Sequence, residues 1–246
     1  MLSLAGLNAS GYRLPPLIRR IPACLRALKT DCLESALSMV QYDSKQLETA
    51  INALLIGTTS FFRDASVFAS LDRFQIPGII QRSPNPRVLS VASSGGEELY
   101  SIAMLFARHG ALSRSRFVGR DCRPSAIATA SRGCYSAHAG DIIPADLAAE
   151  HVSSVGGNLR IRPHLASKIE WECRDSLDKP APSEKWDLIL CRNLAIYLEA
   201  EVTRELWANL TDALAPGGFL VVGRAEKPRT SDLNCIAPCI YQKSNF

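Results

Sequence analysis

The clearest hydrophobic pattern in the chain runs from Arg87 to Phe106. Residues 87–92 form an apolar, β-branched run of strand length, and the apolar positions from Leu99 to Phe106 repeat at helical spacing. Ser-Ser-Gly-Gly at 93–96 separates the two. Glycine lets the backbone take positive φ, and the free N–H groups that begin a helix point back at such a turn. The pattern predicts a strand, a turn and a helix, with a ligand site at the turn.

The alternation of strand and helix patterns continues towards the C-terminus. RFVGRD at 116–121 precedes a helical pattern, and so does WDLILCRN at 186–193, before FLVVG begins a further strand at 219. This alternation predicts an α/β fold with a doubly wound, Rossmann-like sheet. In such a sheet an acidic residue that ends the second strand commonly holds ribose hydroxyls. Asp121 has that position, and a simple turn-forming aspartate is the alternative interpretation.

The region before this sheet has helical spacing and no strand alternation. We expect a small all-helical N-terminal domain at 14–80, a Pro- and Ser-rich linker at 81–86 and an α/β domain at 87–246. Residues 1–13 carry no clear pattern and are expected to be a loose start.

Residues 136–168 interrupt the rhythm and predict a small inserted β-subdomain. Gly156 and Gly157, flanked by polar and β-prone residues, indicate a hairpin. His151 and His164 lie in this segment without ligand-like spacing, so we interpret them as surface or structural residues and expect no metal.

Glu97 and Glu98 limit what the turn can bind. Carboxylates in a first helical turn are favoured by the helix dipole, which is one sufficient reason for them. Acidic groups also repel phosphate and suit a cationic or hydroxyl-bearing ligand. Neither GxGxxG nor GKT is present, so a phosphate cradle is not indicated. A nucleoside without phosphates fits better, and S-adenosylmethionine (SAM) is the candidate.

The composition of the chain indicates the cellular compartment in which we expect the protein. With 47% hydrophobic and 21% charged residues the chain is typical of globular proteins, and a net charge of +4 does not argue for nucleic acid. The eight cysteines form no CxxC pair, and neither a signal peptide nor an apolar run of membrane-spanning length is evident. We therefore expect a reduced, cytoplasmic protein that does not insert into a membrane.

Five blocks together resemble the CheR family of SAM-dependent protein-glutamate O-methyltransferases of bacterial chemotaxis. The resemblance covers about residues 20–245 and is carried by TTSFFRD, ASSGGEELYSIA, GRD, CRNLAIYL and APGGFLVVGRAE, in that order. It implies a helical N-terminal domain packed on a class I methyltransferase sheet, with a small β-subdomain inserted about where the hairpin is expected.

The resemblance also implies roles for single residues. Arg63 would reach the carboxylate of the cofactor, and Tyr197 would stand by the transferred methyl group; these two are the expected catalytic residues. Asp121 would take the ribose. The full set of expected cofactor-binding residues is Thr59, Arg63, Ser94, Gly95, Glu97, Glu98, Asp121, Cys122, Asp175, Ser176, Asn193 and Leu194.

The chain departs from the family pattern at several of these blocks. Gly57 stands where the family has Asn, Leu99 where it has Pro, and Arg123 where it has a second Asp. In the last block Ala225 replaces a serine and follows Arg224. We expect cofactor binding to survive these changes, and we expect Arg123, Arg224 and a shortened 136–168 region to reshape what enters on the substrate side.

The resemblance implies a carboxyl O-methyltransferase that uses SAM, releases S-adenosylhomocysteine (SAH) and acts on glutamates of a chemoreceptor cytoplasmic domain. We expect a monomer with a protein substrate and no nucleic-acid partner. Two alternatives stay open, a small-molecule O-methyltransferase and a non-catalytic module that binds SAM or SAH. A nucleic-acid methyltransferase is disfavoured because CRNLAIY stands where a DPPY- or NPPY-like tetrad would be.

Overall fold

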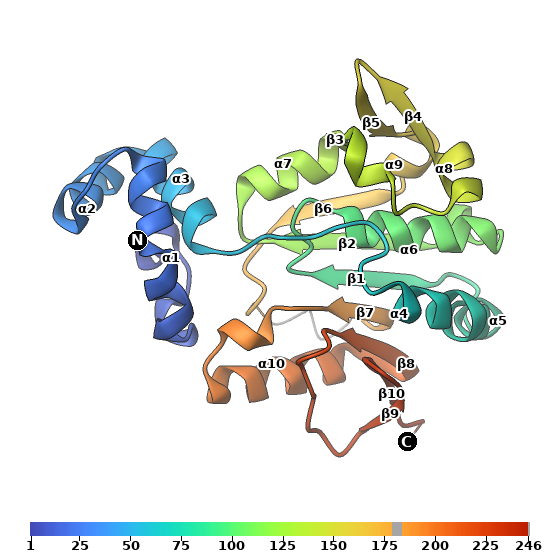
Figure 1. Cartoon of the computed structure of the whole chain (residues 1–246). Coiled ribbons are helices and arrows are strands. Elements are labelled where there is room, and N and C mark those ends of the chain that lie inside the picture. The colour runs from blue at the N-terminus through green and yellow to red at the C-terminus, as the bar shows by residue number, and fades with distance from the viewer. Residues whose placement is uncertain (179–183, 246) are drawn as a thin grey trace.

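The computed structural model describes residues 1–178 and 184–245 and is built on a seven-stranded sheet (Figure 1). The strand order is β6-β2-β1-β7-β8-β10-β9. The strands of this sheet are β1 (Arg87–Val91), β2 (Arg116–Asp121), β6 (Ile169–Cys173), β7 (Trp186–Cys191), β8 (Leu214–Val222), β9 (Leu233–Ala237) and β10 (Ile240–Lys243).

Five neighbouring strands of the sheet are parallel, and the last hairpin reverses direction. The pairs β6–β2, β2–β1, β1–β7 and β7–β8 are parallel, whereas β10 is antiparallel to both β8 and β9. The chain order changes direction between β1 and β7, where ligands of doubly wound sheets bind. This arrangement confirms the predicted class I methyltransferase sheet.

The side chains of each strand point alternately to the two faces of the sheet, and different helices cover these two faces. The bounds of the helices are α1 (Leu14–Leu28), α2 (Leu33–Tyr42), α3 (Ser44–Leu54), α4 (Ala65–Ser70), α5 (Ile76–Arg82), α6 (Glu97–Arg108), α7 (Pro124–Arg132), α8 (Ala145–His151), α9 (Pro163–Ala166) and α10 (Ala200–Ala213). Val88 of β1 packs with α4, α5 and α6, and Leu89 packs with α10 on the opposite face.

The first residues of the chain are packed, which corrects the expected loose start. Leu2, Leu7 and Tyr12 are buried in the same apolar cluster as α10. Tyr12 also forms a bridge with Leu198. The segment therefore closes part of the sheet face next to the end of β7, which sequence periodicity did not indicate because its turns are short.

Helices α1, α2 and α3 form a separate group beside the sheet and share a small apolar core of their own (Figure 1). By contrast, α4 and α5 pack in the main cluster with the sheet. Residues 81 and 82 belong to the last turn of α5. The domain limits 14–80, 81–86 and 87–246 remain a prediction.

A second, three-stranded antiparallel sheet of order β3-β5-β4 begins just before the interruption at 136–168 and has its other two strands within it. Its strands are β3 (Cys134–Ser136), β4 (Val152–Val155) and β5 (Asn158–Ile161). Val155 pairs with Asn158 across Gly156 and Gly157, both with positive φ, so the hairpin lies where the sequence predicts it.

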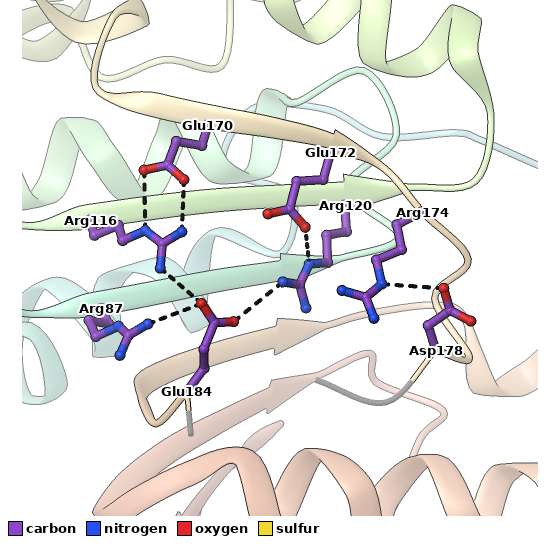
Figure 2. Close-up of polar contacts among 8 residues, drawn as sticks. All are labelled: Arg87, Arg116, Arg120, Glu170, Glu172, Arg174, Asp178 and Glu184. Atoms are coloured by element: carbon purple, nitrogen blue, oxygen red, sulfur yellow. Dashed lines mark hydrogen bonds and ion pairs between the residues drawn. The ribbon is translucent and has the colours of Figure 1, made fainter. Parts of the chain in front are cut away.

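Charged side chains cover β1, β2 and β6 on the face that also carries α10 (Figure 2). We call this group the charged ladder; it consists of Arg87, Arg116, Arg120, Glu170, Glu172 and Glu184. Arg116 pairs with Glu170 at 2.8 Å and with Glu184 at 3.1 Å, and Arg120 pairs with Glu172 at 2.6 Å. The guanidinium of Arg87 lies 5.0 Å from the ring centroid of Trp186. In the described residues of the connection from β6 to β7, 174–178 and 184–185, there is no helix. We infer that the aliphatic parts of the ladder side chains cover the apolar strand residues on this face instead.

Candidate functional site

A pocket opens at the carboxyl ends of β1, β2 and β7, with about 980 Å³ of space including its mouth. Its walls come from the turn after β1, the ends of β2 and β7, the extended segment before α4, and the start of the chain. Pockets of this kind, at the point where strand order reverses, are the usual ligand sites of doubly wound sheets.

The turn after β1 takes positive φ at Gly96, as its glycine allows, and also at Ala92 and Ser94, whereas Gly95 does not have a positive φ. Ser94 and Gly96 have φ of 51° and 93°. A Cβ at Gly96 would come within 2.6 Å of the Trp171 ring, so glycine is required there for both conformation and space. The hydroxyl of Ser93 is buried without a hydrogen-bond partner in the described part of the chain, which leaves it able to bind a ligand.

Asp121 lies at the end of β2 as expected, and both of its carboxylate oxygens are occupied. Oδ2 accepts hydrogen bonds from Ser94 N at 2.9 Å and Arg123 Nη2 at 3.2 Å. Oδ1 accepts from the backbone N and from Nε of Arg123, both at 3.0 Å. The guanidinium therefore takes two of the four acceptor positions of the carboxylate.

Glu98 belongs to a set of charges that we call the inner network, made of Glu98, Arg192, Asp64 and Arg224. All but Arg224, whose side chain is 69% exposed, are largely buried. Arg192 donates to Glu98 at 3.1 Å and to Asp64 at 2.5 Å, and Glu98 also accepts from the Ser90 hydroxyl. Arg224 pairs with Asp64 at 2.7 Å. The network ties β1, β7 and the segment before α4 together behind the pocket.

Arg63 lines the pocket from the segment before α4. Its Nη1 donates to the Thr58 carbonyl at 2.9 Å. Its neighbour Phe62 has a φ of 48°, and its N–H donates to the Ser101 hydroxyl, which anchors this segment on α6. The backbone on both sides of Arg63 is thus held while its charged group faces the pocket.

Glu226, which the sequence analysis did not select, positions the loop after β7. Its carboxylate accepts from the backbone N–H groups of Asn193 at 2.8 Å, Ala195 at 2.7 Å and Gly223 at 2.6 Å. Asn193 has a φ of 60°, and Tyr197 follows in the same short loop. The available sequence signal for this role was a glutamate four residues after an apolar strand-like run, at the end of the block APGGFLVVGRAE.

Tyr12 is a second residue that sequence reasoning missed. It lines the pocket, and burial, helped by the carboxylates of Asp121 and Asp175, raises the pKa of its hydroxyl. Arg13 N donates to the Tyr197 carbonyl at 2.8 Å, so the start of the chain is fastened to the loop that carries Tyr197.

The pocket brings together most of the predicted site residues. Those that line it are Thr59, Arg63, Ser94, Glu98, Asp121, Cys122, Ser176, Asn193, Leu194 and Tyr197. Gly95 and Glu97 line an adjoining cavity, and Asp175 lines a third cavity next to it.

Glu97 and Cys122 differ from freely ionising groups. Burial raises the pKa of the Glu97 carboxyl, and its Oε2 is buried with no partner among the residues described. Burial, followed by the charges of Asp121 and Asp175, raises the pKa of the Cys122 thiol to about 12. Cys122 is therefore a neutral thiol at physiological pH and a wall residue rather than a nucleophile.

These residues fit a ligand that carries hydroxyls, a positive charge and a carboxylate. Ser93 and Glu97 supply unpartnered polar atoms, Arg63 supplies a cation, and Leu194 and Tyr197 supply apolar surface. The described chain contains no group of three or more His, Cys, Asp or Glu placed to hold a metal ion.

The sheet order and the position of the pocket are those of the class I methyltransferase fold. The family described as CheR methyltransferase, SAM binding domain, matches residues 57–236, which is more than half of the chain. The protein belongs to this CheR family.

Relatives of the chain differ in length. An uncharacterised 104.1 kDa protein of Rhodobacter capsulatus is 30% identical over 92% of this chain, which spans 24% of that protein. Chemotaxis protein methyltransferase 1 of Pseudomonas aeruginosa is 29% identical over 73% of this chain and 69% of its own length. The N-methyltransferase NodS of Bradyrhizobium japonicum, solved with SAH, has 16% identity and a TM-score of 0.39, over 82% of this chain and 71% of NodS.

Across residues 1–178 and 184–245, no helix is both long enough and apolar enough to span a membrane.

Proposed function

We propose that this protein is a SAM-dependent carboxyl O-methyltransferase that esterifies glutamate side chains in the cytoplasmic domain of a chemoreceptor. The match to the CheR SAM-binding domain supports the cofactor. The name of the Pseudomonas relative, a chemotaxis protein methyltransferase, supports a protein substrate in chemotaxis.

The observation that carries this proposal is the convergence of Arg63 and Tyr197 on one pocket beside the turn after β1. They come from segments more than a hundred residues apart in the sequence. The backbone next to each is anchored: Phe62 N–H donates to Ser101, and the N–H groups of Asn193 and Ala195 donate to Glu226. A fixed cation and a fixed aromatic hydroxyl at the same cavity suit the binding and alignment of a carboxylate.

The remaining residues would hold the cofactor. Arg63 would bind its carboxylate, Glu97 and Glu98 would lie near its ammonium group, and Asp121 would receive the ribose hydroxyls. Asp175 and Ser176 would border the adenine, and Thr59, Asn193 and Leu194 would complete the wall. Ser94, Gly95 and Cys122 would contribute backbone and surface at the turn and at the end of β2.

The reaction asks for alignment rather than proton transfer. A glutamate side chain has a pKa of about 4.3, so it is already ionised at neutral pH and needs no general base. When bound, SAM would supply the methyl group on its sulfonium sulfur, and the neutral thioether SAH would be the leaving group. The protein contributes orientation and exclusion of water, and orientation alone can lower a barrier by about 7–11 kcal/mol. Tyr197 would orient the attacking oxygen, and the charge of Arg63 would attract it.

The experiment that tests this function is transfer of labelled methyl from SAM to a lysate of the source cell, followed by alkaline treatment and capture of volatile methanol. Base-labile label on a receptor-sized protein is the expected result. Tyr197→Phe should mainly lower kcat, and Arg63→Ala should weaken cofactor or substrate binding. Unchanged kinetics in both variants would refute the assigned roles.

Two other outcomes would replace the proposal. Label confined to small molecules would indicate a small-molecule O-methyltransferase of the same fold. Binding of SAM or SAH without any transfer would indicate a non-catalytic binding module.

A further inference from the structure

The contact between Arg123 and Asp121 has a consequence for cofactor binding. The guanidinium of Arg123 donates through Nε to Oδ1 and through Nη2 to Oδ2 of Asp121, so the contact is bidentate. The backbone N–H groups of Ser94 and Arg123 take one further position on each oxygen. A carboxylate offers about four acceptor positions, and all four are filled. No position is left for a vicinal diol while this ion pair persists.

The pair is also buried. The side chains of Arg123 and Asp121 are 11% and 5% exposed, so bulk water does not weaken their interaction as it would at the surface. Nη2 of Arg123 donates in addition to the Ser94 hydroxyl at 3.1 Å, and that hydroxyl donates to the Gly57 carbonyl at 2.7 Å. The guanidinium is thus held at three places in the pocket wall.

Gly57 makes this position of Arg123 possible. A Cβ at residue 57 would lie 2.6 Å from Cζ of Arg123 and would overlap its terminal nitrogens. Gly57 does not have a positive φ, so its conformation does not itself demand glycine. Space for the guanidinium is therefore the reason for glycine at 57. Both positions are departures from the family pattern, and the structure shows that they are in contact.

Arg123 also lines the two cavities that adjoin the pocket. The larger of these two cavities has about 1230 Å³ of space including its mouth, and its lining residues include the acidic residues Glu48, Asp175 and Asp178. Once it leaves Asp121, the guanidinium has acceptors on that side. These acceptors would stabilise a second conformation of the Arg123 side chain, in which it no longer contacts Asp121.

We propose that Arg123 is a gate on the cofactor site: it occupies the ribose position of Asp121 and must swing away before the ribose of SAM or SAH can bind. The proposal rests on the function proposed above, in which Asp121 receives the ribose. A protein whose binding-competent state is only partly populated binds its ligand more weakly by that fraction. Arg123 therefore lowers cofactor affinity in the wild-type protein.

Two substitutions on opposite sides of this contact test the gate. Arg123→Ala removes the guanidinium, and Gly57→Ala displaces it while keeping its charge. Isothermal titration of SAH into the full chain should show a dissociation constant at least about tenfold lower in both variants, the change expected if the gate is closed in about nine molecules of ten. Stopped-flow measurements should place the gain in the association rate, with the dissociation rate little changed.

Two variants are the matched controls and should bind SAH as the wild type does. They are Arg132→Ala, at the far end of the helix α7 that Arg123 precedes, and Gly78→Ala, where a Cβ would meet no atom within 4 Å. Weaker or unchanged SAH binding in both test variants, while wild-type protein binds SAH and transfers methyl groups, would overturn the gate alone. Failure of the wild type and of every variant to bind SAH would overturn the cofactor assignment and the gate together.

Discussion

The inner network and the charged ladder are both built from arginines and carboxylates, yet the pairs made by Arg192 and by Arg116 lie at different depths. Each group also has one member of the other kind, the exposed Arg224 in the network (69%) and the buried Arg120 in the ladder (7%). Arg192 of the inner network has a side chain 3% exposed, and its partners Glu98 and Asp64 are 12% and 17% exposed. In the ladder, Arg116 is 38% exposed and its partner Glu170 is 55% exposed. Arg192 of the inner network directly follows the carboxyl end of β7. The ladder lies along β1, β2 and β6 (Figure 2).

This difference in burial indicates different roles for the two groups of charges. A buried pair has lost its hydration, so each charge depends on its partner, and removal of one member is costly. An exposed pair keeps most of its hydration and contributes about 0–1 kcal/mol. We infer that the inner network fixes the pocket, whereas the ladder mainly covers apolar strands.

The largest expected effect comes from Arg192→Met. It would leave Glu98 and part of the acceptor capacity of Asp64 unpaired inside the protein, so we expect a loss of about 3–5 kcal/mol in the free energy of unfolding. Urea denaturation measures it. The matched ladder variant Arg116→Met should lose about 1 kcal/mol or less. Equal losses in the two variants would remove the distinction between the regions.

Glu226→Gln should have an intermediate effect. One carboxylate oxygen accepts from Ala195 and the other from Asn193 and Gly223, and an amide can replace only one oxygen as acceptor. We expect a loss of about 1–3 kcal/mol and a lower kcat with little change in SAH affinity, because Tyr197 is carried on this loop. Glu184→Gln in the ladder is the control. A kcat equal to that of the wild type would argue against the positioning role of Glu226.

Glu97 should make stability depend on pH. Burial raises its pKa in the folded protein, so the folded state favours the neutral acid. The associated stability is present below the unfolded pKa and is lost as the pH rises through the folded pKa. Glu97→Gln should therefore show a smaller fall in unfolding free energy from about pH 4.3 upward. Thermal unfolding across that range measures the difference, and identical profiles would contradict it.

Salt should produce the smallest effect and should act on the ladder alone. At 1 M salt the Debye length falls to about 3 Å, which screens exposed pairs more than buried ones. The stability loss of Arg116→Met should shrink between about 0.01 M and 1 M NaCl, whereas that of Arg192→Met should persist. Parallel urea titrations at the two salt concentrations test this. A salt response of similar size in both variants would show that solvent ions screen the two pairs equally, which would contradict the difference in burial between them.

Local patterns predicted the strand, turn and helix from Arg87 to Phe106, because each depends on periodicity and glycine within a short stretch. The hairpin at Gly156 and Gly157 is local for the same reason. The last hairpin, β9 and β10, was not predicted, since β9 is mostly exposed and lacks a clean alternation.

The candidate site could be predicted as a set of residue types but not as a set of contacts. Tyr12 was missed because its burial depends on packing against the end of β7. The relation between Gly57 and Arg123 was also invisible, although both departures were noted, because the residues are far apart in sequence and meet only in the fold.

The structure of this protein with SAH bound tests the central claim most directly. The account predicts SAH in the pocket after β1, with its carboxylate at Arg63, its ribose hydroxyls on Asp121, its sulfur facing Tyr197, and Arg123 moved away from Asp121. SAH bound elsewhere, or bound in the pocket with its ribose away from Asp121 and the Arg123 pair intact, would contradict it.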